Sequence, residues 1–143
     1  MKTVRDILKV KGQAVWCVEM GSTVFEALGR MAEKEVGALV VMDGARLAGI
    51  ISERDYARKI ILLGRTSPNT RVEEIMTSHV AYTHLEQSIE ECMAIMTDKR
   101  IRHLPVIDEG KIVGIISIGD VVKHRLTEME RESAALRDYI QTA

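Results

Sequence analysis

The chain of 143 residues carries 20 Lys and Arg against 21 Asp and Glu, a formal net charge of −1. This length suits one compact domain or two small halves that share a core. The near-zero charge argues against broad binding to nucleic acid or to a membrane surface, which usually needs a basic excess. No apolar run reaches the ~20 residues of a membrane span, and the N-terminus lacks the apolar segment of a signal peptide. We therefore expect a cytoplasmic protein whose cysteines, Cys17 and Cys92, are buried free thiols that stay reduced.

The first half of the chain predicts, in order, a helix, a strand, a second helix, two strands and a third helix. Thr23 and Glu26 match the S/T-x-x-E pattern of a capping box, so the second helix begins at Thr23. Its apolar residues recur at helical spacing. Turn residues separate the two later strands, and the third helix begins at Ser52. The first helix and the three strands are expected at residues 4–10, 14–18, 38–42 and 46–52.

The second half of the chain repeats the first. When the sequence is shifted by 65 positions, 11 of the 34 residues from Thr23 to Tyr56 are identical to their counterparts, whereas chance would give roughly two. The repeat predicts strands at residues 79–83, 103–107 and 111–117. One β-α-β-β-α unit is too small to bury its apolar face alone, so we expect an α/β fold in which two repeats pack as a pseudo-two-fold pair. The expected division is a first repeat at residues 1–64, a linker at 65–70, a second repeat at 71–126 and a C-terminal helical extension at 127–143.

The junction between the last strand and the last helix of each repeat has the same pattern, as GIISERD and GIISIGD. A Ser at the start of a helix followed by an Asp three residues later is a variant of the capping box and needs no ligand. The alternative is a ligand site, because a helix start offers free N–H groups and a positive dipole end to a phosphate. Ser52 and Ser117 could donate to phosphate oxygens, and Asp55 and Asp120 could accept from a ribose diol.

Basic residues follow both junctions, which favours an anionic ligand. They are Arg54, Arg58, Lys59, Lys123, His124 and Arg125. The flanking strands could supply an apolar slot for a flat base.

The two junctions, together with the segment RHLPVIDEGKIVGIIS, resemble the CBS domain family, named after cystathionine β-synthase. The resemblance runs from Val4 to Leu126 and is that of a stand-alone tandem pair, a Bateman module. It implies that adenosine-containing ligands such as AMP, ADP, ATP, NAD or S-adenosylmethionine bind in clefts between the repeats. It also implies a homodimer with a regulatory, energy-sensing function.

The resemblance assigns roles by motif position. The two junction Asp side chains would hold ribose, and the two Ser side chains would contact phosphate. Arg102 and His103 occupy a strand position that often reaches phosphates, whereas the first repeat has Gly37 and Ala38 there, so the two clefts differ chemically. The implied ligand-binding residues are Gly49, Ser52, Arg54, Asp55, Tyr56, Arg58, Lys59, Thr83, Arg102, His103, Pro105, Ile116, Ser117 and Asp120.

Other features of the sequence favour structural roles. The four histidines lack metal-ligand spacing, so no metal site is expected. Ser52 and Ser117 lack the second glycine of a nucleophile elbow, so we do not expect the protein to be an enzyme. Two rival interpretations remain: an enzyme that acts on nucleotides, and a dimerisation scaffold that binds no ligand. Residues 121–140 predict either a solvated tail helix or a helix that packs on a second subunit.

Overall fold

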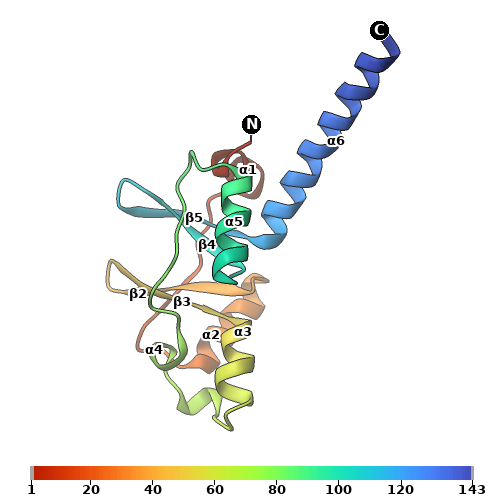
Figure 1. Ribbon diagram of the computed structural model, residues 1–143. Coiled ribbons are helices and arrows are strands. Elements are labelled where there is room, and N and C mark those ends of the chain that lie inside the picture. Colours follow the sequence, from red (N-terminus) through yellow and green to blue (C-terminus); the bar gives the residue numbers. More distant parts are fainter. Residues whose placement is uncertain (1, 143) are drawn as a thin grey trace. The chain divides into compact units, whose positions relative to one another are not determined.

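The computed structural model describes residues 2–142 and confirms the α/β class with two repeats (Figure 1). The chain divides into two compact units. The first-repeat unit spans residues 15–81, and the second-repeat unit combines the segment up to residue 14 with the chain from residue 82 onward. The units do not coincide with the sequence repeats, because the leading helix of each repeat belongs to the unit of the other. Within residues 2–142, no helix has both the length and the apolar character needed to cross a membrane.

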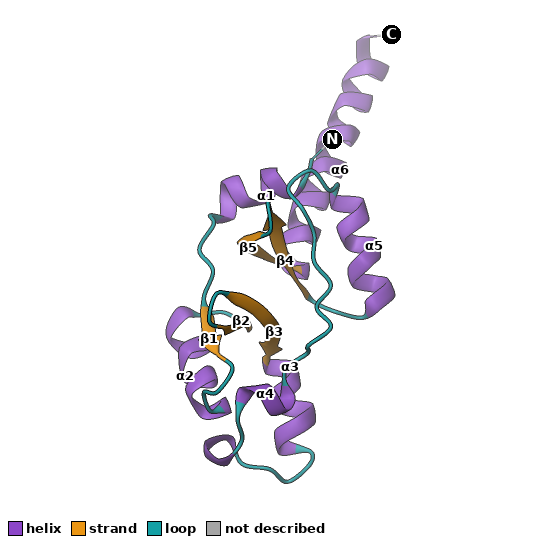
Figure 2. Ribbon diagram, turned by 90° about the vertical axis from the view of Figure 1, so that its left-hand side faces the viewer, coloured by secondary structure: helices purple, strands orange, loops and turns teal. Residues whose placement is uncertain are grey.

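The first-repeat unit is built on a three-stranded sheet in the order β1-β2-β3 (Figure 2). β1 (Cys17–Glu19) runs parallel to β2 (Ala38–Asp43), which pairs antiparallel with β3 (Arg46–Ser52). The apolar face of α2 (Val24–Lys34) packs in the core with these strands. The remaining elements are α3 (Glu53–Tyr56), the π-helical turn η1 (Ala57–Ile61), the 3-10 turn η2 (Ser67–Asn69) and α4 (Val72–Ile75).

The second-repeat unit is built on a hairpin of two antiparallel strands. The two helices that begin and end the chain lie in this unit together with the second copy of the capped helix. Its elements are α1 (Val4–Lys11), α5 (Ile89–Lys99), β4 (His103–Asp108), β5 (Lys111–Ser117) and α6 (Ile118–Thr142).

The predicted strand at residues 79–83 is wrong, and its counterpart in the first repeat is shorter than predicted. Only Thr83 pairs with the hairpin, through a bridge to Val106. Pro105 explains the difference, because the equivalent Val40 donates its N–H to the Trp16 carbonyl at 3.2 Å. Proline has no N–H to give, so this ladder cannot extend.

Gly49 and Gly114 lie where a leading segment crosses each hairpin. A Cβ on Gly49 would come within 2.6 Å of the Thr77 carbonyl oxygen, and Thr77 is itself hydrogen-bonded to Ile50. A Cβ on Gly114 would meet Cδ2 of Leu8, on α1, at 2.8 Å. The repeated glycine therefore has a packing role in each unit, independent of any ligand.

Alanine at these two equivalent positions should have unequal costs. Gly49→Ala must displace a backbone carbonyl, so we expect the free energy of unfolding to fall by about 1–3 kcal/mol. Gly114→Ala meets only the end of a leucine side chain, which can change rotamer, so the loss should be smaller. Urea unfolding of the wild type and both variants measures the difference. An equal or larger loss for Gly114→Ala would contradict this account.

A buried histidine lies on the inner face of α6. His124 is 8% exposed, and among the described residues its Nδ1 has no hydrogen-bond partner. Burial lowers the pKa of His124, and Lys2 and Lys123 lower it further against the opposing effect of Asp120 and Asp6. His124 is therefore neutral in the folded protein at neutral pH.

Acidification should destabilise the second-repeat unit through His124. The pKa of this group is lower in the folded state than its unfolded value of about 6.5, so its contribution to stability is present above that pH and is lost as the pH falls through the folded value. The free energy of unfolding should therefore fall less between about pH 7.5 and about pH 5 in His124→Gln than in the wild type. The exposed His79 provides the control variant His79→Gln, which should keep the wild-type pH dependence. Identical pH dependence in the wild type and His124→Gln would refute the assignment.

Candidate functional site

Each junction places a serine at the end of a strand and an aspartate one turn into the following helix. In the first-repeat unit, Asp55 Oδ2 accepts hydrogen bonds from the backbone N–H of Ser52 at 3.0 Å and from its hydroxyl at 3.1 Å. In the second-repeat unit, Asp120 Oδ2 accepts from the Ser117 N–H at 2.8 Å. Each serine Oγ accepts from the aspartate N–H in return, at 3.3 and 3.2 Å. Both junctions therefore form a reciprocal capping box, as the ligand-free interpretation of the motif requires.

Each aspartate forms an ion pair with a lysine, but the two lysines come from different parts of the repeats. Lys59 lies one turn after Asp55, and its Nζ is 3.1 Å from Asp55 Oδ1. The residue equivalent to Lys59 in the second repeat is His124, which cannot take this role because it is buried and neutral. There Lys11, the last residue of α1, places its Nζ 2.6 Å from Asp120 Oδ2.

Lys11 is a site residue that the sequence analysis missed. It lies 109 positions from Asp120, and only the placement of α1 in the second-repeat unit brings the two together. Burial raises the pKa of Asp120, but the Lys11 ammonium and the Ser117 N–H outweigh burial and hold that pKa below its ordinary value. Asp120 is therefore an ionised, half-buried carboxylate whose orientation is fixed by two donors.

The strand position opposite each junction serine differs between the units, as the sequence predicts. His103 pairs with Ser117 across β4 and β5, and Ala38 pairs with Ser52 across β2 and β3. The exposed Arg102 precedes His103. Only the second-repeat unit therefore carries basic side chains at this position.

His103 adds a neutral donor to this position. Burial lowers the pKa of His103, and the positive charges of Lys11 and Arg102 lower it further, whereas Asp120 opposes them. A neutral imidazole offers one N–H and one acceptor nitrogen. The fixed positive charges near Ser117 are therefore those of Lys11, which is paired with Asp120, and of the exposed Arg102.

The other implied residues of the first-repeat unit have varied surroundings. Gly49 is buried beneath the segment at Thr77, and Tyr56 packs half-buried against the core. Arg54 is half-buried, and Arg58 is exposed. Among the implied residues of this unit, Ser52 is hydrogen-bonded to Asp55, and Lys59 forms an ion pair with Asp55.

Three implied residues of the second-repeat unit belong to its interior. Ile116 is fully buried, and Pro105 is buried in β4. The buried hydroxyl of Thr83 hydrogen-bonds to Gln87 and lies 3.6 Å from Cys92 Sγ.

A second group of residues lies at the end of the hairpin where β5 passes into α6, and we call it the junction cluster. Its members are Lys11, Arg102, His103, Ser117 and Asp120.

The two junctions open helices of different length. α3 has 4 residues before the chain passes into a π-helical turn, whereas α6 has 25 residues. The aligned peptide dipoles of each helix favour an anion at its N-terminus, an effect that acts within the first turn.

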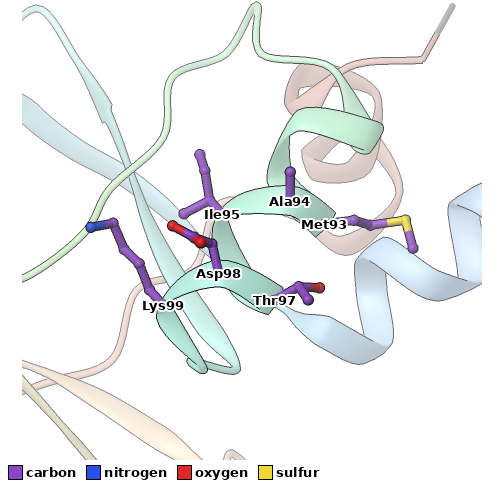
Figure 3. A pocket seen from close by; sticks show the side chains of 6 residues that line it. All are labelled: Met93, Ala94, Ile95, Thr97, Asp98 and Lys99. Atoms are coloured by element: carbon purple, nitrogen blue, oxygen red, sulfur yellow. The ribbon is translucent and has the colours of Figure 1, made fainter.

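A hollow of about 620 Å³ lies on α5 (Figure 3). Its walls come from α5 alone, which leaves it open to solvent, and they include no junction residue. The lining residues are Met93, Ala94, Ile95, Thr97, Asp98 and Lys99. Within residues 2–142, no three His, Cys, Asp or Glu side chains gather in a way that could hold a metal ion.

Comparison with known proteins identifies the same repeats. The family model described as CBS domain matches residues 4–62 and again residues 72–127. The CBS domain-containing protein CBSX3, mitochondrial, of Arabidopsis thaliana is 42% identical over 149 aligned positions, which cover 97% of this chain and 72% of that protein.

Solved structures agree with this relationship. A protein from Burkholderia ambifaria, described as a signal-transduction protein with CBS domains, is 52% identical with a TM-score of 0.85, covering 88% of this chain and 95% of that one. A hexameric CBS-CP12 protein from bloom-forming cyanobacteria is 28% identical with a TM-score of 0.79, covering 99% of this chain and 86% of that one.

CBS-pair proteins are in general regulatory or signalling modules and not catalysts. Each match of the family model contains one Ser–Asp junction and the hairpin that leads into it. The chain therefore belongs to the CBS domain family and is a tandem pair of CBS domains.

Proposed function

We propose that this CBS pair is a regulatory module that binds an adenosine-containing ligand of the AMP, ADP, ATP or NAD type at its Ser–Asp junctions. The observation that carries the proposal is the state of Asp120, an ionised carboxylate fixed at the start of a 25-residue helix beside Lys11. Membership of a family that generally binds adenosine-containing ligands supports the ligand class.

The ribose would bind to the junction aspartate. Asp120 Oδ2 already accepts from Ser117 and Lys11, whereas among the described residues Oδ1 accepts no hydrogen bond. A carboxylate has about four lone-pair sites, so this side chain retains the capacity to accept from both hydroxyls of a diol. Because its orientation is fixed in advance, little entropy is lost on binding.

The phosphate would bind to the basic side of the junction cluster. Arg102 supplies a fixed charge and a planar fork of donors. Lys11 and the N-terminus of α6 add a second charge and the helix dipole. In the first-repeat unit the corresponding positions are Gly37 and Ala38, and Lys59 is held by the Ile75 carbonyl at 2.8 Å. We therefore expect the second-repeat junction to bind phosphate more tightly.

Ligand binding would be transmitted through α1. A nucleotide that binds Asp120 and offers a phosphate to Lys11 changes the ion pair that anchors the last residue of α1. The chain passes from α1 directly into the first-repeat unit, so the ligand can bias the conformation of both units if it binds one conformation better than another. We also propose that the chain acts as a homodimer in the cytoplasm.

The ribose assignment predicts a difference between AMP and 2′,3′-dideoxy-AMP. Loss of the diol should weaken binding to the wild type by about 1–3 kcal/mol, or about 5- to 150-fold, because Asp120 loses its partners. Asp120→Asn should weaken AMP and abolish most of this discrimination. The exposed Asp98→Asn is the control and should keep it. Equal affinities for the two ligands in calorimetry with the wild type would refute the assignment.

The phosphate assignment predicts a selective loss in Arg102→Ala. A charged hydrogen bond contributes about 1.5–3 kcal/mol, so AMP should bind roughly ten- to a hundredfold more weakly, whereas adenosine should be much less affected. Lys111→Ala, an exposed change at the other end of β5, should leave both affinities unchanged. If AMP and adenosine lose affinity equally, Arg102 has a structural role only.

The complete capping boxes favour a second candidate, a ligand-free dimerisation scaffold, because both Ser–Asp pairs satisfy their own hydrogen bonds. Nucleotide-dependent melting separates the two candidates. A specific ligand at 100 times its dissociation constant adds about 2.7 kcal/mol to the free energy of unfolding. If none of the proposed nucleotides stabilises the protein, the ligand-free scaffold is the remaining candidate.

A further inference from the structure

An apolar stripe runs along the exposed side of α6. The five apolar members are between 38% (Val122) and 65% (Ile140) exposed, and the sixth member is an exposed serine. They recur at alternating intervals of four and three residues, the heptad spacing of a coiled-coil seam. The stripe consists of Val122, Leu126, Met129, Ser133, Leu136 and Ile140.

The stripe is distinct from the face with which α6 packs in its own unit. Val121 is fully buried, and His124 is 8% exposed. Glu128 accepts the Lys2 N–H at 3.1 Å on the same inner face. At 100° per residue these positions point about 100° to about 160° away from the stripe. The second half of α6 projects beyond the rest of the unit (Figure 1), and residues 130–141 are exposed throughout.

Charged residues flank the stripe in a pattern that selects one orientation of a partner helix. In heptad notation, Leu126, Ser133 and Ile140 occupy a positions, and Val122, Met129 and Leu136 occupy d positions. In a parallel coiled coil, the residue before each a position faces the residue five positions later on the other helix. This rule pairs Glu132 with Arg137 of the second copy and Arg125 with Glu130 of the second copy. Each pair occurs twice by symmetry, and all four contacts join opposite charges. Within its own chain, Arg125 also lies 3.3 Å from Glu90, 3.6 Å from Glu128 and 3.7 Å from Glu132.

The antiparallel arrangement with the same overlap is unfavourable. Positions before an a residue then face one another, so Glu132 would lie against Glu132 of the second copy. Positions after a d residue also face one another, so Glu130 would lie against Glu130 of the second copy. Like charges at such close range disfavour this pairing.

We propose that α6 is a docking surface for a second copy of this chain, and that residues 122–140 of the two copies form a short parallel coiled coil. The heptad spacing provides the apolar seam, and the flanking charges specify the parallel orientation. The surface is independent of nucleotide binding, because the stripe includes no residue of the junction cluster. Each of the two proposals can therefore fail without the other.

Disulfide trapping tests the orientation of the two helices. The sequence-based expectation that both cysteines are buried is wrong for Cys17, which is exposed, so the background variant Cys17→Ser removes this native thiol. Ser133→Cys then places identical thiols opposite each other in a parallel seam, and we expect a covalent dimer in a glutathione redox buffer. The neighbouring Ala134→Cys lies outside the seam and should stay largely reduced under the same conditions. Equal trapping at both positions, or none at Ser133→Cys, would overturn the proposal.

Sedimentation equilibrium of the full chain tests the energetics. Leu136→Glu places a charge in the seam and should raise the dimer dissociation constant at least about tenfold, whereas Ala134→Glu should leave it unchanged. Glu132→Arg and Arg137→Glu should each weaken the dimer, and the double variant should restore it. An unchanged dissociation constant in Leu136→Glu would place the dimer interface elsewhere and refute this role of α6. Failure of the double variant to recover would exclude the parallel orientation.

Discussion

Leu8, on α1, lies against Gly114 of the second hairpin, and the segment after α4 crosses Gly49 of the first. Each leading segment thus packs in the unit of the other repeat. At the first hairpin this close approach requires a residue without a side chain, because a Cβ at Gly49 would lie 2.6 Å from a carbonyl oxygen. The same exchange delivers Lys11 to Asp120, so the packing of the fold and the charge of the candidate site have one cause.

The two junctions are alike in backbone geometry and different in electrostatics. Lys59 serves Asp55 from within the same helical segment, whereas Lys11 serves Asp120 from α1. The position that would correspond to Lys59 is occupied by the buried His124. The two repeats can differ in this way without loss of the fold, because the capping box holds each strand-to-helix turn by itself. Under the proposed function, the phosphate would bind in the second-repeat unit, which carries the basic Arg102.

Local patterns in the sequence predicted much of this structure. The capped starts of α2 and α5, both hairpins and both Ser–Asp junctions lie where the S/T-x-x-E and G-I-I-S patterns indicate. Two features escaped prediction for physical reasons. The strand expected at residues 79–83 requires a ladder N–H that Pro105 lacks, although the repeat made the two halves look equivalent. The contact of Lys11 with Asp120 depends on tertiary packing over 109 positions, which no local pattern records.

The account rests on the claim that the junction cluster is the nucleotide site. Backbone amide chemical shifts recorded during a titration with AMP test it most directly, because they report on the backbone of both units at once. The account predicts the largest changes at Ser117, Asp120 and Lys11, with smaller changes at Ser52 and Asp55. Saturable changes confined to the outer face of α5, or no changes at either junction, would contradict it.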